Sequence, residues 1–181
     1  MSIEVIDFHA HFPYGNDDWL RPSREEYIAR FGQEKWSHIL SLSNRAQEKW
    51  WDRWNFGRPS TMNYSPEELA DRWVNELQTK GVSKIVFVTG GGNKILRDVV
   101  AKYPEQFFGF AHHDPFEPDA VEQLDKAVSE WGFSGYKILA PAVKHPLTDP
   151  KLDPLWAKAE ELGIPVLIHF GVLGGGGTDN G

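Results

Sequence analysis

The regular return of short apolar runs along the chain is the feature that most constrains its fold. Four of these runs begin at residues 84, 106, 134 and 165, so successive starts are 22, 28 and 31 residues apart. Such a gap leaves room for one helix, and strands joined by helical crossovers lie parallel. The sequence therefore predicts an α/β fold with a parallel sheet, a pattern that an open doubly wound sheet and a closed barrel share.

The segments between the runs carry the signals of helix starts and ends. Ser65, Pro66 and Glu68 form a capping-box start with proline at the first helical position, and Gly81 supplies the stop. The complete pattern predicts strands at 3–8, 84–89, 106–111, 134–139 and 165–170, and helices at 65–81, 93–103, 118–131 and 153–162.

A long insertion separates the first predicted strand from the next. The runs that begin at Ile3 and Lys84 are 81 residues apart, and residues 13–64 between them are rich in aromatic side chains. Five of the eight tryptophans lie there: Trp19, Trp36, Trp50, Trp51 and Trp54. Much of 23–54 has helical character. Two interpretations stay open: a helical excursion that packs on the barrel rim or on another subunit, or a lid over the strand ends.

Composition narrows the function classes. The chain has no cysteine, so any bound metal must use imidazole and carboxylate ligands. With 19 basic and 26 acidic residues the net charge is -7, without the basic stripe that nucleic-acid phosphates require. No membrane-spanning stretch or signal peptide is recognisable in the sequence, which predicts a cytoplasmic protein that acts on a small molecule. A homo-oligomer is also expected.

Three histidines stand at the carboxyl ends of predicted strands. His9 and His11 are two residues apart, so on a strand they project to one face together with Asp7, whose carboxylate is expected to orient a ligand imidazole through its far nitrogen. His169 ends the apolar run 165–170 in the same way. Since α/β barrels place their functional groups at this end of the strands, the three imidazoles predict one shared metal site with an open position.

Three segments resemble the amidohydrolase superfamily: Asp-Phe-His-Ala-His at 7–11, Gly-Phe-Ser-Gly-Tyr-Lys at 132–137 and Gly-Ile-Pro-Val-Leu-Ile-His at 163–169. The branch that they resemble contains aminocarboxymuconate semialdehyde decarboxylase and related metal-dependent enzymes. This resemblance implies a (β/α)8 barrel and assigns one divalent ion, zinc in preference to manganese, to His9, His11 and His169. It also implies a histidine after strand 6 and an aspartate ligand after strand 8.

Length sets how much of that barrel is expected here. A complete barrel of this type takes about 250 residues, and this chain has 181. We therefore expect a single domain over 1–181 that holds about the first five β/α units, interrupted by the insertion at 13–64. The predicted edges at strands 1 and 5 must then be paired or covered.

Further residues are candidates for catalysis and substrate binding. The resemblance places Lys137 where binuclear relatives carry a carboxylated lysine, and we favour instead an uncarboxylated lysine that meets a substrate carboxylate or a buried ion-pair partner. His113, next to His112, is either a pocket residue or a solvated rim histidine. Arg53 and Arg58 in the insertion are candidates for carboxylate binding.

These residues lead to three hypotheses about function. The first is a metal-dependent, nonoxidative decarboxylase of a small carboxylated or aromatic substrate. The second is a metal-dependent hydrolase of an amide, lactone or ester, and the third is an inactive truncated barrel that binds metal or serves as an assembly partner. Metal chemistry is common to the first two, because an ion can polarise a substrate oxygen or activate water.

Overall fold

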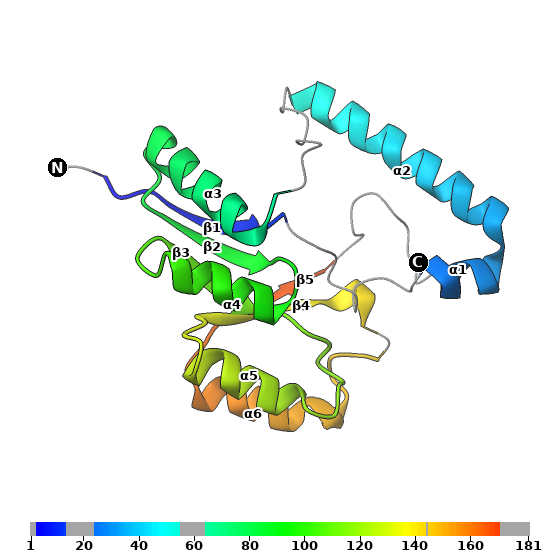
Figure 1. The fold of residues 1–181 in the computed structure, drawn as a ribbon. Coiled ribbons are helices and arrows are strands. Elements are labelled where there is room, and N and C mark those ends of the chain that lie inside the picture. The colour runs from blue at the N-terminus through cyan, green and yellow to red at the C-terminus, as the bar shows by residue number, and fades with distance from the viewer. Residues whose placement is uncertain (1–2, 14–23, 55–63, 144, 171–181) are drawn as a thin grey trace.

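The structure, a computed structural model, describes residues 3–13, 24–54, 64–143 and 145–170. Five parallel strands follow one another in the order β1-β2-β3-β4-β5 (Figure 1). The strands are β1 (Ile6–His11), β2 (Lys84–Thr89), β3 (Phe107–Ala111), β4 (Gly135–Leu139) and β5 (Val166–His169). The helices are α1 (Arg24–Phe31), α2 (Gln33–Trp54), α3 (Pro66–Lys80), α4 (Asn93–Lys102), α5 (Ala120–Ser129) and α6 (Asp153–Glu161).

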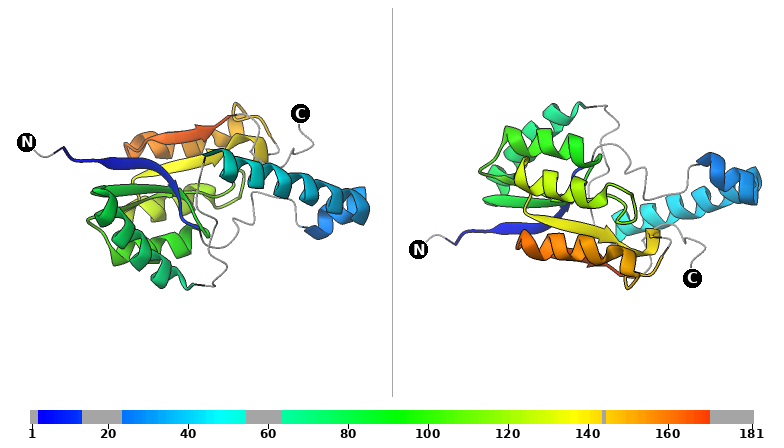
Figure 2. Two further views of the ribbon diagram at one scale, coloured as in Figure 1. Left: turned by 90° about the horizontal axis from the view of Figure 1, so that it is seen from above. Right: turned by 90° about the horizontal axis from the view of Figure 1, so that it is seen from below.

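The sheet curls into a half-barrel with helices α3 to α6 along its convex side (Figure 2). The main core lies between the sheet and these helices and includes Phe87, Tyr136 and Leu124. A second apolar cluster, with Val86, Val88 and Phe110, lies on the other, concave face, because successive strand residues alternate between faces. The α/β fold of (β/α)8 type, with its first five units, is thus confirmed.

Local signals fixed the helix boundaries as expected. Ser65 and Glu68 form both bonds of the capping box, Pro66 begins α3, and Gly81 ends it in the left-handed conformation at φ 67°. Helix α6 differs in detail, because a 3₁₀ turn at Pro150–Leu152 runs directly into it and makes Asp153 the first helical residue instead of the cap.

Strand β1 lies further along the chain than predicted, over 6–11 instead of 3–8, so His9 and His11 are part of the strand. Its register against β2 shifts: Asp7 pairs with Ile85, but Ala10 pairs with Phe87. One extra residue of β1 is accommodated there, as in a β-bulge. Strict alternation is therefore interrupted between Asp7 and Ala10, and a second shift between Ala10 and His11 restores the original offset. That Asp7 shares a face with His9 stays a prediction.

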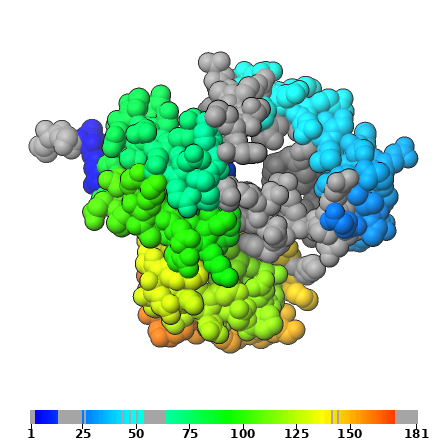
Figure 3. All heavy atoms as spheres, in the orientation of Figure 1, coloured from blue at the N-terminus to red at the C-terminus, as the bar shows by residue number. Residues whose placement is uncertain are grey.

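The described part of the aromatic insertion forms a helical arm, α1 and α2, beyond the carboxyl ends of the strands (Figure 1). The two helices are separated at Gly32, whose φ is 90°, and pack on one another through Tyr27 and Trp36, whose ring centroids are 5.4 Å apart. The space-filling view places this arm to one side of the body that carries α3 to α6 (Figure 3). Trp19 lies outside the described residues, and whether the arm acts as a lid or as a subunit contact stays a prediction.

None of the helices in the described ranges has the combined length and hydrophobicity needed to cross a bilayer.

Large apolar side chains are exposed near the two edge strands: Ile3 and Val5 before β1, Ile6 and Phe8 within it, and Phe170 directly after β5. Among the described strands, β1 and β5 form the two edges of the sheet. The 181-residue chain alone is therefore expected to self-associate and to bind a hydrophobic dye, because such surface favours association. Light scattering after size exclusion and dye fluorescence measure this. A cooperatively folding monomer that binds no dye would contradict the expectation.

Candidate active site

His9 and His11 lie together at the carboxyl end of β1, with ring centroids 5.2 Å apart. The Nδ1 atom of His11 is 2.6 Å from the hydroxyl oxygen of Thr89, at the end of the neighbouring strand. The carboxylate of Asp7 accepts a hydrogen bond from the backbone N–H of His9 at 3.0 Å. The two predicted ligands thus converge, while Asp7, expected to orient an imidazole ring, contacts the main chain.

His169 ends β5 on the concave face, where Leu139 of β4 is its partner in the parallel register. Its Nε2 atom is buried and has no hydrogen-bond partner among the described residues. Burial, followed by the positive charge of Lys137, lowers the pKa of His9; Asp7 opposes this shift and His169 adds to it. The histidines at the ends of β1 and β5 are thus close enough for the charge of His169 to affect the pKa of His9.

The donor chemistry of these residues fits a divalent metal ion. Imidazole nitrogens are ligands for zinc and manganese, and a buried ring nitrogen without a partner is costly unless something binds it. Within the described ranges, no three histidine or carboxylate side chains already stand in an arrangement that would hold an ion. A site shared by His9, His11 and His169 therefore stays a prediction, supported by the unpaired nitrogen of His169.

Lys137 is a buried cation on the concave face, with 1% of its surface exposed. It alternates with Tyr136 and Ile138, which pack in the main core, and pairs in register with Leu167 of the concave cluster. The structure gives it no hydrogen bond or ion pair with the described residues. Burial lowers the pKa of its ammonium group. A buried ammonium without a counter-ion can bind an anionic group strongly. Folding has already removed the water around it, so anion binding does not incur that free-energy cost again.

His112 and His113 are buried, with 1% and 4% of their surfaces exposed, so the interpretation as solvated rim histidines is wrong. The ring of His113 contacts the carbonyl of Ala120 at 2.9 Å through Nε2 and the Asn93 amide at 3.2 Å through Nδ1. The hydroxyl of Tyr136 donates to the His113 carbonyl at 3.0 Å. Because both ring nitrogens are engaged, these contacts favour a structural role for His113 over the predicted catalytic one.

Burial of His113 predicts acid sensitivity. Desolvation lowers the pKa of its imidazole from 6.5 to about 4. At pH values between these two, the imidazole is protonated in the unfolded chain but neutral in the native protein. The free energy of unfolding should therefore fall by about 3 kcal/mol as the pH drops through this window. In urea titrations at several pH values, His113→Gln should flatten the dependence, whereas His38→Gln, at an exposed position on α2, should leave it unchanged. Equal slopes for the two variants would contradict the assignment.

The two arginines proposed for substrate binding have different outcomes. Arg53 lies in the last turn of α2 and is exposed, on the arm beyond the strand ends. Arg58 lies outside the described residues. Both assignments stay predictions.

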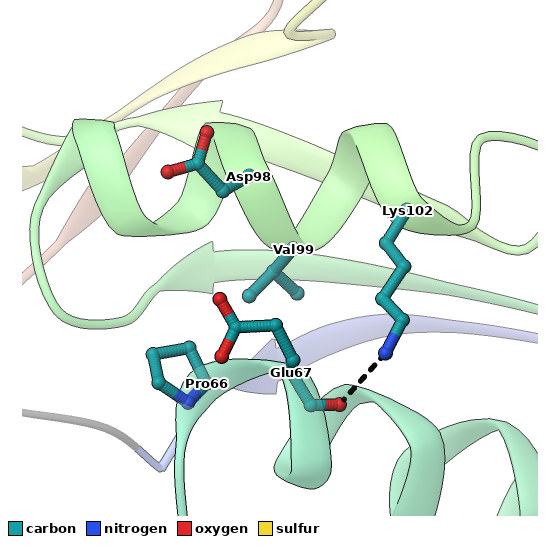
Figure 4. A pocket seen from close by; sticks show the side chains of 5 residues that line it. All are labelled: Pro66, Glu67, Asp98, Val99 and Lys102. Atoms are coloured by element: carbon teal, nitrogen blue, oxygen red, sulfur yellow. Dashed lines mark hydrogen bonds between the residues drawn. The ribbon is translucent and has the colours of Figure 1, made fainter.

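A small surface cavity of about 10 Å³ lies between α3 and α4, lined by Pro66, Glu67, Asp98, Val99 and Lys102 (Figure 4). The Lys102 ammonium donates to the Glu67 carbonyl at 3.2 Å and pairs with Asp71. A cavity of this volume has room for about one water molecule. Because the cavity lies on the helical, convex side, it is no candidate for the site at the strand ends.

Sequence reasoning missed Thr89. It is buried, with 6% of its surface exposed, and it holds the His11 ring from a position 78 residues away in the chain. The one signal that could have indicated it is its place as the last residue of β2, since neighbouring strand ends meet at one edge of a parallel sheet.

Comparison with known proteins finds a matching family and partial relatives. The family model described as Amidohydrolase matches residues 6–179. The chain is 33% identical over 87 residues to gamma-resorcylate decarboxylase of Rhodococcus jostii, covering 42% of this chain and 26% of that protein. It is 37% identical over 81 residues to the decarboxylase orsB of Emericella nidulans, covering 43% and 24% respectively. The alignments thus span about a quarter of each curated relative.

Solved structures share the fold. The 4-oxalomesaconate hydratase of Rhodopseudomonas palustris is 23% identical with a TM-score of 0.54, over 91% of this chain and 52% of that one. The 5-carboxyvanillate decarboxylase of Novosphingobium aromaticivorans, in complex with manganese and a nitrobenzoic acid, is 18% identical with a TM-score of 0.57, over 92% and 50%. The chain therefore corresponds to about half of each solved chain.

Proposed function

Because this chain belongs to the amidohydrolase family, whose model matches residues 6–179, we propose that it carries the metal-binding part of a metal-dependent enzyme. The proposed reaction is nonoxidative decarboxylation of a small aromatic or otherwise carboxylated substrate. The observation that carries this proposal is the buried, unpartnered Nε2 of His169, at the same end of the sheet as the pair His9 and His11. The decarboxylases among its relatives support the reaction type.

His9, His11 and His169 would hold one divalent ion. Three neutral imidazoles leave room for substrate or water on a tetrahedral ion such as zinc, and the manganese bound by the 5-carboxyvanillate decarboxylase supports that ion as well. When bound, the ion would supply a positive charge that attracts and polarises substrate oxygens. Zinc stays our first choice, because imidazole suits it better than it suits manganese.

Lys137 would bind the substrate carboxylate. Lys137 is buried and pairs in register with Leu167 of the concave apolar cluster, which also contains Val86 and Phe110. Such a surface suits a flat apolar ring. A carboxylate placed beside this cation would neutralise a charge that the protein otherwise leaves buried and unpaired. Arg53 and Arg58, on the insertion, are further proposed carboxylate contacts.

Lys137 also provides a proton close to the reacting carbon. Loss of carbon dioxide breaks a carbon–carbon bond, and the electron pair left on the substrate carbon must take up a proton. Burial lowers the pKa of Lys137, which makes its ammonium a better acid than an exposed lysine. His113 is less suited to this task, because both of its ring nitrogens are already bonded.

Hydrolysis of an amide, lactone or ester is the second candidate, since a probable 2-pyrone-4,6-dicarboxylic acid hydrolase is among the structural neighbours. A third is a protein that binds metal without turnover. The predicted homo-oligomer and cytoplasmic location stay predictions.

Substrate assays separate these candidates. With aromatic acids as substrates we expect metal-dependent release of carbon dioxide, and with lactones and amides little production of acid. Removal of the metal by a chelator should abolish turnover, and added zinc or manganese should restore it. Acid without carbon dioxide would favour the hydrolase, and carbon dioxide release that survives complete metal removal would overturn the proposed mechanism. Metal binding without any turnover would favour the third candidate.

A further inference from the structure

We infer that Thr89 is a positioning residue for His11: its hydroxyl group binds the Nδ1 side of the imidazole and thereby sets Nε2 as the nitrogen that coordinates metal. The inference rests on the proposed metal site and extends it to a residue that is not a ligand. It starts from the contact of 2.6 Å between His11 Nδ1 and Thr89 Oγ1.

Thr89 holds β1 in two ways at once. Its side chain contacts the His11 ring, and its carbonyl oxygen accepts a hydrogen bond from the backbone N–H of Phe12 at 2.9 Å. His11 and Thr89 are also partners in the register between β1 and β2. The main chain directly after His11 is thus held by the residue that also contacts the ring, so the hydroxyl and the ring have little freedom to separate.

The segment that follows Thr89 is itself locked. A Cβ atom on Gly90 would lie 2.4 Å from the Phe12 Cβ atom, so only glycine allows this close approach. The Gly90 N–H donates to Nε2 of His112 at 3.2 Å, and Nδ1 of that buried ring lies 3.0 Å from the Phe110 carbonyl. The position of the Thr89 hydroxyl therefore depends on β3 as well as on β2.

The chemical consequence follows from the two nitrogens of imidazole. In the neutral ring one nitrogen carries the proton and the other has the lone pair that a metal needs, and the hydrogen bond at one nitrogen decides which is which. A threonine hydroxyl that accepts a bond from Nδ1–H leaves the lone pair on Nε2. Threonine suits this role because its branched Cβ restricts the rotation of the hydroxyl, and partners of this kind orient metal-bound histidines.

The sequence pointed to Asp7 for this task, but the structure engages Asp7 elsewhere. The Asp7 carboxylate accepts a hydrogen bond from the backbone N–H of His9. The side chain of Thr89 contacts the ring of a predicted ligand, and it does so without adding a charge beside the metal.

Three variants test the inference. Thr89→Val removes the hydroxyl and keeps the shape, Thr89→Ser restores a hydroxyl, and Thr79→Val removes a hydroxyl that bonds the Asn75 carbonyl within α3. Titration of the metal-free protein with zinc in competition with a chromophoric chelator should show affinity weakened by about 10- to 100-fold in Thr89→Val. Thr89→Ser should stay within about threefold of the wild type on the same scale, and Thr79→Val should be unchanged.

A second readout does not depend on metal or on activity. In metal-free protein, nitrogen-15 spectra of the histidine side chains should show His11 protonated on Nδ1, with its signal assigned by loss in His11→Asn. Thr89→Val should give a mixture of tautomers and Thr89→Ser should restore the single form.

Zinc affinity of Thr89→Val equal to that of the wild type, or failure of Thr89→Ser to restore it, would overturn the inference. If the wild type binds no zinc, the proposed metal site is wrong, and the wild-type spectrum still decides whether Thr89 fixes the His11 ring. Should Thr89→Val fail to fold, Thr89→Ser and that spectrum carry the decision.

Discussion

His169→Ala is expected to remove metal from the protein and to lower turnover by about a thousandfold, since a catalytic ion contributes several kcal/mol to the transition state. The imidazole ends β5 with a buried nitrogen that has no hydrogen-bond partner in the described part of the chain. Its removal should therefore delete the proposed ligand without breaking a hydrogen bond that stabilises the fold. Metal content by plasma mass spectrometry and turnover by carbon dioxide release measure the two effects.

The control for this variant is His38→Ala, which removes an exposed imidazole on α2 and should change neither metal content nor turnover. The melting temperature of metal-free His169→Ala should match that of metal-free wild type, because a small gain from losing the unsatisfied nitrogen offsets the lost packing. Full metal content in His169→Ala would show that His169 is no ligand. A large loss of stability in the metal-free variant would mean that the ring has a structural role instead.

Gly90→Ala is expected to lower the free energy of unfolding by about 3 kcal/mol or more, at the upper end of what overpacking costs. The added Cβ would lie 2.4 Å from the Cβ of Phe12 and 2.8 Å from its carbonyl oxygen. The carbonyl oxygen is main chain and cannot turn away as the end of a long side chain could. The φ of Gly90, 152°, is also one that residues with a side chain rarely adopt.

The matched control is Gly109→Ala on β3, where the new Cβ would meet the ring of Phe133 at 3.0 Å. A ring can shift by a few tenths of an ångström, so this variant should lose only about 1 kcal/mol. Urea unfolding of both variants gives the comparison. Zinc affinity should also fall in Gly90→Ala, because Phe12 follows His11 directly. Equal losses in the two variants would contradict the account of Gly90 as the contact that fixes the end of β1.

Features decided by nearby residues could be predicted from the sequence. The capping box at Ser65, the stop at Gly81 and the spacing of the apolar runs are local signals, and they predicted the helices and the parallel strands. The barrel type was implied by the resemblance of three segments to the amidohydrolases. The positions of His9, His11 and His169 at strand ends followed from the same runs. Their resemblance to the amidohydrolases is confirmed by the family match over residues 6–179.

Features decided by strand register and burial required the tertiary structure. The bulge in β1 depends on how that strand pairs with residues about 78 positions away, and it interrupts the regular alternation between Asp7 and Ala10. Burial of His113 on the helical side depends on Asn93, Ala120 and Tyr136, which only the packed β/α units bring together. The Thr89 contact with His11 arises in the same way. Periodicity and capping depend on residues a few positions apart, so they can be predicted from the sequence. The partner of each polar atom is set by contacts between strands, which form only in the folded sheet.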